Sequence, residues 1–192
     1  MCATLLINKL KYFTCILGVD LVPRREGGTW LGISKQGQIG ILTNYRQGPS
    51  FITHGKKGRG ELVTRFLKSN DKPEAYIEKV NQTGEDYNGF NLIVGKISTD
   101  SFEFSYHCNQ EHKPIEDLRA GVFCMSNRYL DFGWRKVVSG KEKFGKIVQM
   151  QISINEKITL LLELLQDKTR YIYILNQCTG FGQFYADMQV SV

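Results

Sequence analysis

The sequence lacks any apolar run long enough to cross a bilayer. A membrane-spanning helix needs about 20 consecutive apolar residues, and the apolar N-terminal stretch is broken by Asn8, Lys9 and Lys11. No basic residue precedes that stretch, so it does not fit a secretory signal. These absences predict an intracellular, cytoplasmic protein that contacts membranes only at their surface.

Cysteine and histidine are also scarce. The five cysteines are odd in number and have no Cys-x-x-Cys spacing, which favours free thiols in a reducing compartment. Of the three histidines, only His107 and His112, with Cys108, resemble a metal cluster. Neighbouring residues of a strand point to opposite faces, so the spacing predicts no metal site.

Acidic residues are fewer than basic ones, 19 against 25, which gives a formal charge of +6. This charge favours anionic partners. The basic residues are nevertheless spread along the chain, without a basic face interleaved with aromatics or a recognised motif. We therefore expect no nucleic-acid partner, and the oligomeric state stays open.

A chain of 192 residues with 42% hydrophobic residues can fill one core, which predicts a single domain over 1–192. Apolar alternation and turn residues predict several strands. The first hairpin turns at 34–37, with Gly37 needing a positive φ, and the strands over 87–95 and 101–108 should pair. The predicted strands are 3–7, 30–33, 39–42, 87–95, 101–108 and 121–125.

Helical spacing predicts helices over 60–68 and 134–144. Asp71 with Glu74, and Ser153 with Glu156, have the spacing of capping boxes, and each pair predicts the start of a further helix. We expect Trp30 and Trp134 to anchor the core. The fold class is then α+β, an antiparallel sheet faced by helices.

Four segments, in matching order and spacing, resemble the transport and Golgi organisation 2 family. They are the hairpin 27–34 with 42–45, then 58–63, then 87–93, and Ser126-Asn127 with 134–136. The resemblance is strongest over 18–167 and implies a partial N-terminal-nucleophile hydrolase αββα sandwich. The family's Asn-Arg-Asp-Glu motif is absent, and the likeness fades after Asp167. We expect a shortened isoform or an incomplete gene model.

The resemblance also implies a catalytic site. Relatives of this type use an N-terminal cysteine, here Cys2, as the nucleophile, with its own α-amine as the base. By motif match, the oxyanion donors are the backbone N–H groups of Asn44 and Tyr45 and the amide of Asn127. The alternative for Asn44 and Asn127 is an ordinary strand-end role, with bonds to local backbone.

A second candidate site is the Gly-rich run 55–60, which leads into a helix. Lys56, Lys57 and Arg59 could bind a haem propionate or an acyl-coenzyme A phosphate there, and the alternative is a solvated loop. The resemblance then implies a handler of haem or acyl-lipid cargo, active in Golgi organisation, protein secretion and lipid homeostasis. It needs no cofactor and is associated with the Golgi or mitochondria. The alternative function is an amide or thioester hydrolase that uses Cys2, which the absent motif weakens.

Overall fold

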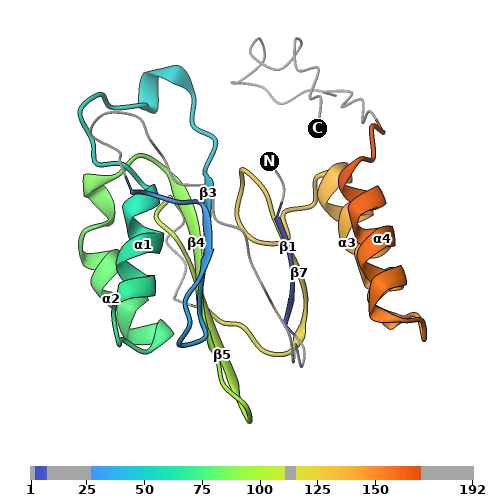
Figure 1. Ribbon diagram of the computed structural model, residues 1–192. Coiled ribbons are helices and arrows are strands. Elements are labelled where there is room, and N and C mark those ends of the chain that lie inside the picture. The colour runs from blue at the N-terminus through green and yellow to red at the C-terminus, as the bar shows by residue number, and fades with distance from the viewer. Residues whose placement is uncertain (1–2, 8–26, 111–115, 170–192) are drawn as a thin grey trace. The chain divides into compact units, whose positions relative to one another are not determined.

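The computed structural model describes residues 3–7, 27–110 and 116–169 (Figure 1). By its internal contacts the chain divides into two compact units, Met1–Phe132 and Gly133–Val192. In chain order the elements are β1 (Ala3–Ile7), β2 (Leu31–Ile33), β3 (Gln38–Asn44), η1 (Pro49–Phe51), α1 (Gly60–Lys68), α2 (Pro73–Gln82), η2 (Gly84–Asp86), β4 (Phe90–Ile97), β5 (Phe102–Cys108), β6 (Glu116–Asp117), β7 (Gly121–Met125), α3 (Arg135–Gln149) and α4 (Ile154–Leu165).

The first unit is built on a five-stranded antiparallel sheet in the order β2-β3-β4-β5-β6. The predicted pairing of β4 with β5 is confirmed, with Ile93 opposite Tyr106. The first hairpin also turns as predicted, because Gly37 has φ +82° and its N–H donates to Ser34 O. The predicted α+β class is therefore confirmed.

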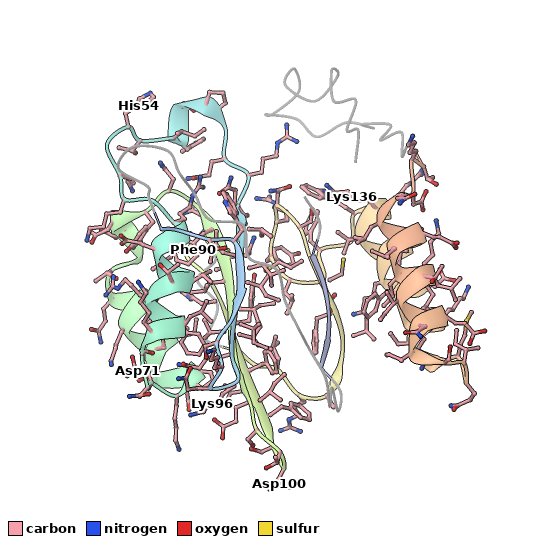
Figure 2. The ribbon with its side chains drawn as sticks, in the orientation of Figure 1. His54, Asp71, Phe90, Lys96, Asp100 and Lys136 are labelled. Atoms are coloured by element: carbon pink, nitrogen blue, oxygen red, sulfur yellow. The ribbon has the colours of Figure 1, made fainter. Side chains whose placement is uncertain are left out.

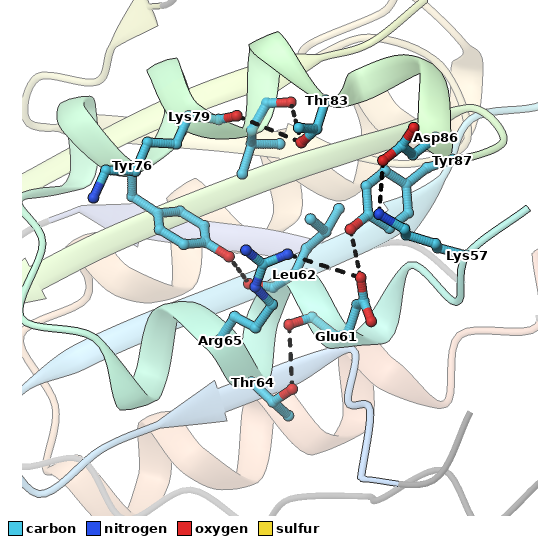
Figure 3. Close-up of polar contacts among 11 residues, drawn as sticks. Lys57, Glu61, Leu62, Thr64, Arg65, Tyr76, Lys79, Thr83, Asp86 and Tyr87 are labelled. Carbon is cyan, nitrogen blue, oxygen red and sulfur yellow. Dashed lines mark hydrogen bonds and ion pairs between the residues drawn. The ribbon is translucent and has the colours of Figure 1, made fainter. Parts of the chain in front are cut away.

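Helices α1 and α2 cover one face of this sheet. The spacing of α1 places Leu62, Val63 and Phe66 on one side, where they pack into a core with even-numbered strand residues such as Leu42 and Leu92. Figure 3 shows the polar contacts around α1, among them a hydrogen bond from the Tyr76 hydroxyl to Leu62 O at 2.6 Å.

A second polar contact joins α1 to the start of β4. The Tyr87 hydroxyl donates to Glu61 Oε1 at 2.5 Å. Burial and the neighbouring carboxylate both raise the pKa of Tyr87. The phenol therefore stays protonated and remains the donor, which keeps α1 joined to the segment that leads into β4.

The opposite face of the sheet packs against β7, which pairs with β1 in the register Ala3 to Met125. Alternation along β5 places Phe104, Tyr106 and Cys108 in this second core. The ring of Phe104 lies directly over Gly95, where a Cβ atom would stand 2.2 Å from Phe104 Cδ1. A side chain at position 95 is therefore excluded by the ring.

The second unit consists, among described residues, of α3 and α4, which pack against one another. Lys143 Nζ pairs with Asp167 Oδ2 at 2.5 Å. The predicted capping box of α4 is confirmed, because Ser153 Oγ accepts from the Glu156 N–H and Glu156 Oε2 accepts from the Ser153 N–H. The apolar residues Ile154, Ile158, Leu162 and Leu165 of α4 are exposed.

Three predictions need correction. The predicted capping box at Asp71 is wrong, because α2 begins at Pro73 and its N-cap residue, Lys72, makes no side-chain capping hydrogen bond. Asp71 instead accepts from Lys79 Nζ at 2.8 Å. Helix α3 continues past residue 144 to Gln149. Trp30 is 39% exposed and does not anchor the core.

Among the described helices, none combines the length and apolar character needed to cross a bilayer.

Candidate functional site

The candidate site is a pocket of about 280 Å³ in the first unit. It lies at the end of the sheet where β3 ends, β4 begins and the chain leaves β7 (Figure 1). It is lined by Asn44, Tyr45, Arg46, Gln47, Ile52, Arg59, Asn88 and Asn127. Four of the predicted site residues therefore lie around one pocket, namely Asn44, Tyr45, Arg59 and Asn127.

Backbone pairing joins the two main walls of this pocket. The N–H of Tyr45 donates to Gly89 O at 2.9 Å, which extends the β3–β4 ladder by one step. The N–H of Arg46 donates to Asn127 O at 2.7 Å, and Asn127 Nδ2 donates to Asn44 O at 2.9 Å. The two hydrogen bonds hold the turn after β7 against the end of β3.

A buried polar network underneath fixes the same turn. The N–H of Leu130 donates to the Tyr106 hydroxyl at 3.0 Å, and that hydroxyl donates to Asn91 Oδ1 at 2.9 Å. Asn91 Nδ2 donates to Thr43 Oγ1 at 3.2 Å, and Thr43 Oγ1 donates to Ser126 O at 2.6 Å. Each hydroxyl in this chain of hydrogen bonds accepts from one neighbour and donates to the next, so the donor and acceptor roles are fixed along it. Sequence reasoning missed this network.

Gly89 is the point where three pocket residues meet. Its carbonyl accepts from the Tyr45 N–H and from Arg59 Nη1, each at 2.9 Å. Its own N–H donates to Gln47 Oε1 at 2.6 Å. A Cβ atom at position 89 would stand 2.8 Å from Gln47 Oε1, so a side chain there would displace the Gln47 amide from this position.

Lys56 and Lys57 do not line the pocket with Arg59. Lys56 Nζ donates to Glu85 O at 2.7 Å, and Lys57 Nζ forms an ion pair with Asp86 Oδ2 at 2.7 Å. Both lysines thus contact η2, while Arg59 contacts the start of β4. The structure does not bring the three cations of the Gly-rich run to one point.

The predicted oxyanion donors are partly engaged in backbone bonds. The Tyr45 N–H is used by Gly89 O. Asn127 Nδ2 uses one hydrogen for Asn44 O, and an amide nitrogen carries two. Asn44 Oδ1 is buried without a partner. Cys2 lies outside the described residues, and β1 begins after it at Ala3, which pairs with Met125.

The electrostatic character of the pocket is cationic. Arg46 and Arg59 line it, and none of its lining residues is acidic. Arg128 lies against the Tyr45 ring at 5.1 Å from the centroid and also donates to the Tyr45 hydroxyl. Guanidinium groups and amide N–H groups are the donors that carboxylates and phosphates prefer. The arrangement is therefore suited to an anionic oxygen.

Four lining residues were not predicted as site residues, namely Arg46, Gln47, Ile52 and Asn88. A signal existed for two of them, because Arg46 directly follows the 42–45 motif and Asn88 lies inside the 87–93 motif. Gln47 and Ile52 carry no such signal.

The histidine and cysteine residues of β5 face different surroundings. His107 lies beside Phe90, with ring centroids 5.9 Å apart, while Cys108 belongs to the second core. His112 lies outside the described residues. Within the part of the chain that the structure describes, no three His, Cys, Asp or Glu residues come together as a metal-binding group.

Comparison with known proteins identifies related chains. The sequence profile "Transport and Golgi organisation 2" matches residues 8–188, which includes most of both units. Transport and Golgi organization protein 2 homolog from Homo sapiens is 39% identical over 155 residues, 79% of this chain and 55% of the relative.

Two further relatives agree. The Bos taurus homolog is 39% identical over 133 residues, 69% of this chain and 48% of the relative. Transport and Golgi organization protein 2 from Drosophila melanogaster is 27% identical over 164 residues, 80% of this chain and 57% of the relative. The chain spans about half the length of the curated relatives it matches. The profile match over nearly all of its residues shows that the chain belongs to the Transport and Golgi organisation 2 family.

Proposed function

We propose that this chain binds a hydrophobic anionic molecule and holds its acidic group in the pocket at the end of the sheet. The observation that carries the proposal is the pocket lining: two arginines and four side-chain amides surround one cavity, with no carboxylate among them. The cargo classes that fit are haem, through a propionate, and acyl-coenzyme A, through a phosphate. No resident cofactor is needed for such a role.

The volume of the pocket supports binding of the head of a cargo molecule. Pockets that enclose a whole drug-sized ligand measure roughly 300–1,000 Å³, and this pocket measures about 280 Å³. We infer that an acidic group occupies this space, while an apolar tail or ring extends past Ile52, which lines the pocket. Ile52 is itself half exposed, so it offers apolar surface at that point.

The printed names of the relatives describe transport and Golgi organization. In that setting the chain would act in the cytoplasm, in association with the Golgi or with mitochondria. Its cargo binding would serve haem trafficking or lipid homeostasis, and through them protein secretion.

The direct test is titration of the purified chain with haemin and with palmitoyl-coenzyme A. A charged hydrogen bond contributes about 1.5–3 kcal/mol, so Arg59→Gln should weaken binding of the preferred cargo about 10- to 100-fold. Lys57→Gln is the control, because Lys57 is an exposed cation that pairs with Asp86 outside the pocket lining. Equal losses in the two variants, or no saturable binding by the unaltered chain, would contradict the proposal.

A hydrolase that uses Cys2 is the second candidate. What supports it is the register of β1, since Ala3 pairs with Met125, two residues before Asn127. The remaining hydrogen of Asn127 Nδ2 could serve a developing oxyanion. Turnover of amides or thioesters that disappears in Cys2→Ala and falls steeply in Asn127→Ala would favour this candidate over cargo binding.

A further inference from the structure

The segment between β3 and α1 carries two adjacent apolar side chains on the surface of the first unit. Residues 48–57, here named the apex loop, are all exposed. Phe51 is 63% exposed and Ile52 is 49% exposed. Burial of such side chains is favourable by about 1.5–3 kcal/mol each. The apolar surface of the apex loop is in contact with water, and a partner that covered it would gain this free energy.

The backbone of the apex loop is held in place although its side chains are exposed. The Phe51 N–H donates to Gly48 O at 2.9 Å and forms the turn of η1. Asn88 fastens the far side of the loop, because its Oδ1 accepts from the Thr53 N–H and its Nδ2 donates to Thr53 O, each at 2.9 Å. A loop that is already ordered loses little conformational entropy when a partner binds.

The charge around the apex loop is predominantly positive. The sequence from Arg46 to Gly60 contains no Asp or Glu, while Lys56 and Lys57 are exposed within the loop. The nearby carboxylates belong to Glu61, which accepts from the Tyr87 hydroxyl, and to Glu85 and Asp86, and Asp86 pairs with Lys57. Lys56 instead donates to backbone carbonyl oxygens. Four cations, the two lysines with Arg46 and Arg59, thus stand against three carboxylates, those of Glu61, Glu85 and Asp86.

We propose that the apex loop docks on the surface of an anionic lipid bilayer. Phe51 and Ile52 enter the boundary between head groups and acyl chains, and Lys56 lies at the level of the lipid phosphates. Adjacent apolar side chains flanked by cations are complementary to this interface, which is apolar inside and negative outside. Ile52 also lines the pocket, so docking places the pocket mouth beside the lipid.

The arrangement of the first unit agrees with docking by one end. Figure 2 shows His54 on the apex loop and Asp100 at the far end of the β4–β5 hairpin, on the opposite end of the sheet. A bilayer that contacts the loop therefore does not meet the tip of that hairpin, which carries Asp100. Two inserted side chains give weak and reversible attachment, as expected for a peripheral contact.

The test is co-sedimentation of the full chain with vesicles of phosphatidylcholine alone and with vesicles that also contain phosphatidylserine. The chain should partition onto the mixed vesicles and much less onto the neutral ones. Phe51→Ser should lower partitioning about tenfold or more, and Lys56→Gln about fivefold, since a cation near an anionic surface contributes about 1 kcal/mol. Leu31→Ser and Lys35→Gln are matched controls on the β2–β3 hairpin and should leave partitioning unchanged.

A second measurement reports insertion directly. Phe51→Trp should show fluorescence that is quenched by brominated acyl chains when mixed vesicles are added, beyond any quenching of the same chain without this substitution. Failure of the unaltered chain to sediment, equal partitioning of Phe51→Ser, or absence of added quenching overturns the proposal. Phe51 does not line the pocket, so haemin or palmitoyl-coenzyme A titration of Phe51→Ser separates failure of docking from failure of cargo binding.

Discussion

At the scale of single residues, buried polar side chains connect the strands that carry the site. Asn91 is fully buried in β4, where it links Tyr106 on one side to Thr43 and Ser126 on the other. A buried amide without partners would cost several kcal/mol. The Asn91 amide has hydrogen-bond partners at both its oxygen and its nitrogen. It therefore avoids this cost and holds the turn that carries Asn127.

Tyr106→Phe should therefore destabilise the fold and the pocket together. The substitution leaves the Leu130 N–H and Asn91 Oδ1 without the hydroxyl between them, and unsatisfied buried groups cost about 1–3 kcal/mol each. Urea unfolding should show a loss within that range or above it. Tyr76→Phe is the comparison, since its hydroxyl contacts Leu62 O on the helix-covered face, and it should cost less and leave cargo affinity intact. A larger loss in Tyr76→Phe would contradict this prediction.

His107 should make the stability of the chain dependent on pH. Burial lowers its pKa below the ordinary value of 6.5, so the unfolded chain binds a proton that the folded chain resists. The stabilising contribution is present above pH 6.5 and is lost as the pH falls, by up to about 1.4 kcal/mol per pH unit.

The measurement for His107 is the urea midpoint as a function of pH. Its decrease below about pH 6.5 should be smaller in His107→Gln than in the unaltered chain. His54→Gln, which alters an exposed histidine, should preserve the decrease. Identical pH profiles for the chain and for His107→Gln would refute the prediction.

At the scale of elements, the bounds of a helix were predicted best where apolar spacing was the only local signal and no proline or capping residue competed with it. Helix α1 has the predicted bounds because its apolar spacing is not interrupted. Helix α2 began later than predicted because Pro73, which suits the first helical turn, outweighed the acidic pair at 71 and 74. Strand β6 has only two residues, too few to show an alternating apolar pattern. It is a strand because it pairs with β5, and its own sequence could not predict it.

The two apparent capping boxes give a matched pair of substitutions. Ser153→Ala should cost about 1 kcal/mol, within a range of 0.5–2 kcal/mol, because a true N-cap is lost. Asp71→Ala should cost only about 0.2–1 kcal/mol, the usual contribution of a surface ion pair, here the one with Lys79. Hydrogen exchange at the Glu156 amide, which donates to Ser153 Oγ, should accelerate in Ser153→Ala alone. Equal effects of the two changes would show that the capping assignment is wrong.

At the scale of the whole molecule, the pocket depends on contacts that no local pattern contains. Asn44 and Asn127 are 83 positions apart and meet through one side-chain hydrogen bond. Their resemblance to family motifs indicated that both belong to a site, and the structure places them together with Arg59. Arg46 follows the 42–45 motif directly, whereas Gln47 could not be predicted as a site residue, because its place in the site depends on the hydrogen bond that it accepts from the Gly89 N–H across the sheet.

The two compact units should open at different free energies. Helix α4 contains no buried residue, whereas the first six residues of β4 are all buried. Regions with few buried apolar contacts open first, so amides of α4 should exchange with solvent before those of β4. Hydrogen exchange followed by mass spectrometry at increasing denaturant should resolve the two. Uniform protection across both elements would argue for one cooperative unit.

The ring of Phe104 over Gly95 has a spectroscopic consequence. The closest approach at that glycine is between the position of a missing Cβ and the ring, so one α-proton of Gly95 points into the face of the aromatic system. Ring currents shield a proton held there and move its NMR resonance far upfield. A single shifted glycine signal would then report that β4 and β5 are paired in this register. The same signal would show whether Arg59→Gln, Phe51→Ser or Tyr106→Phe keeps the native sheet before any loss of binding is interpreted.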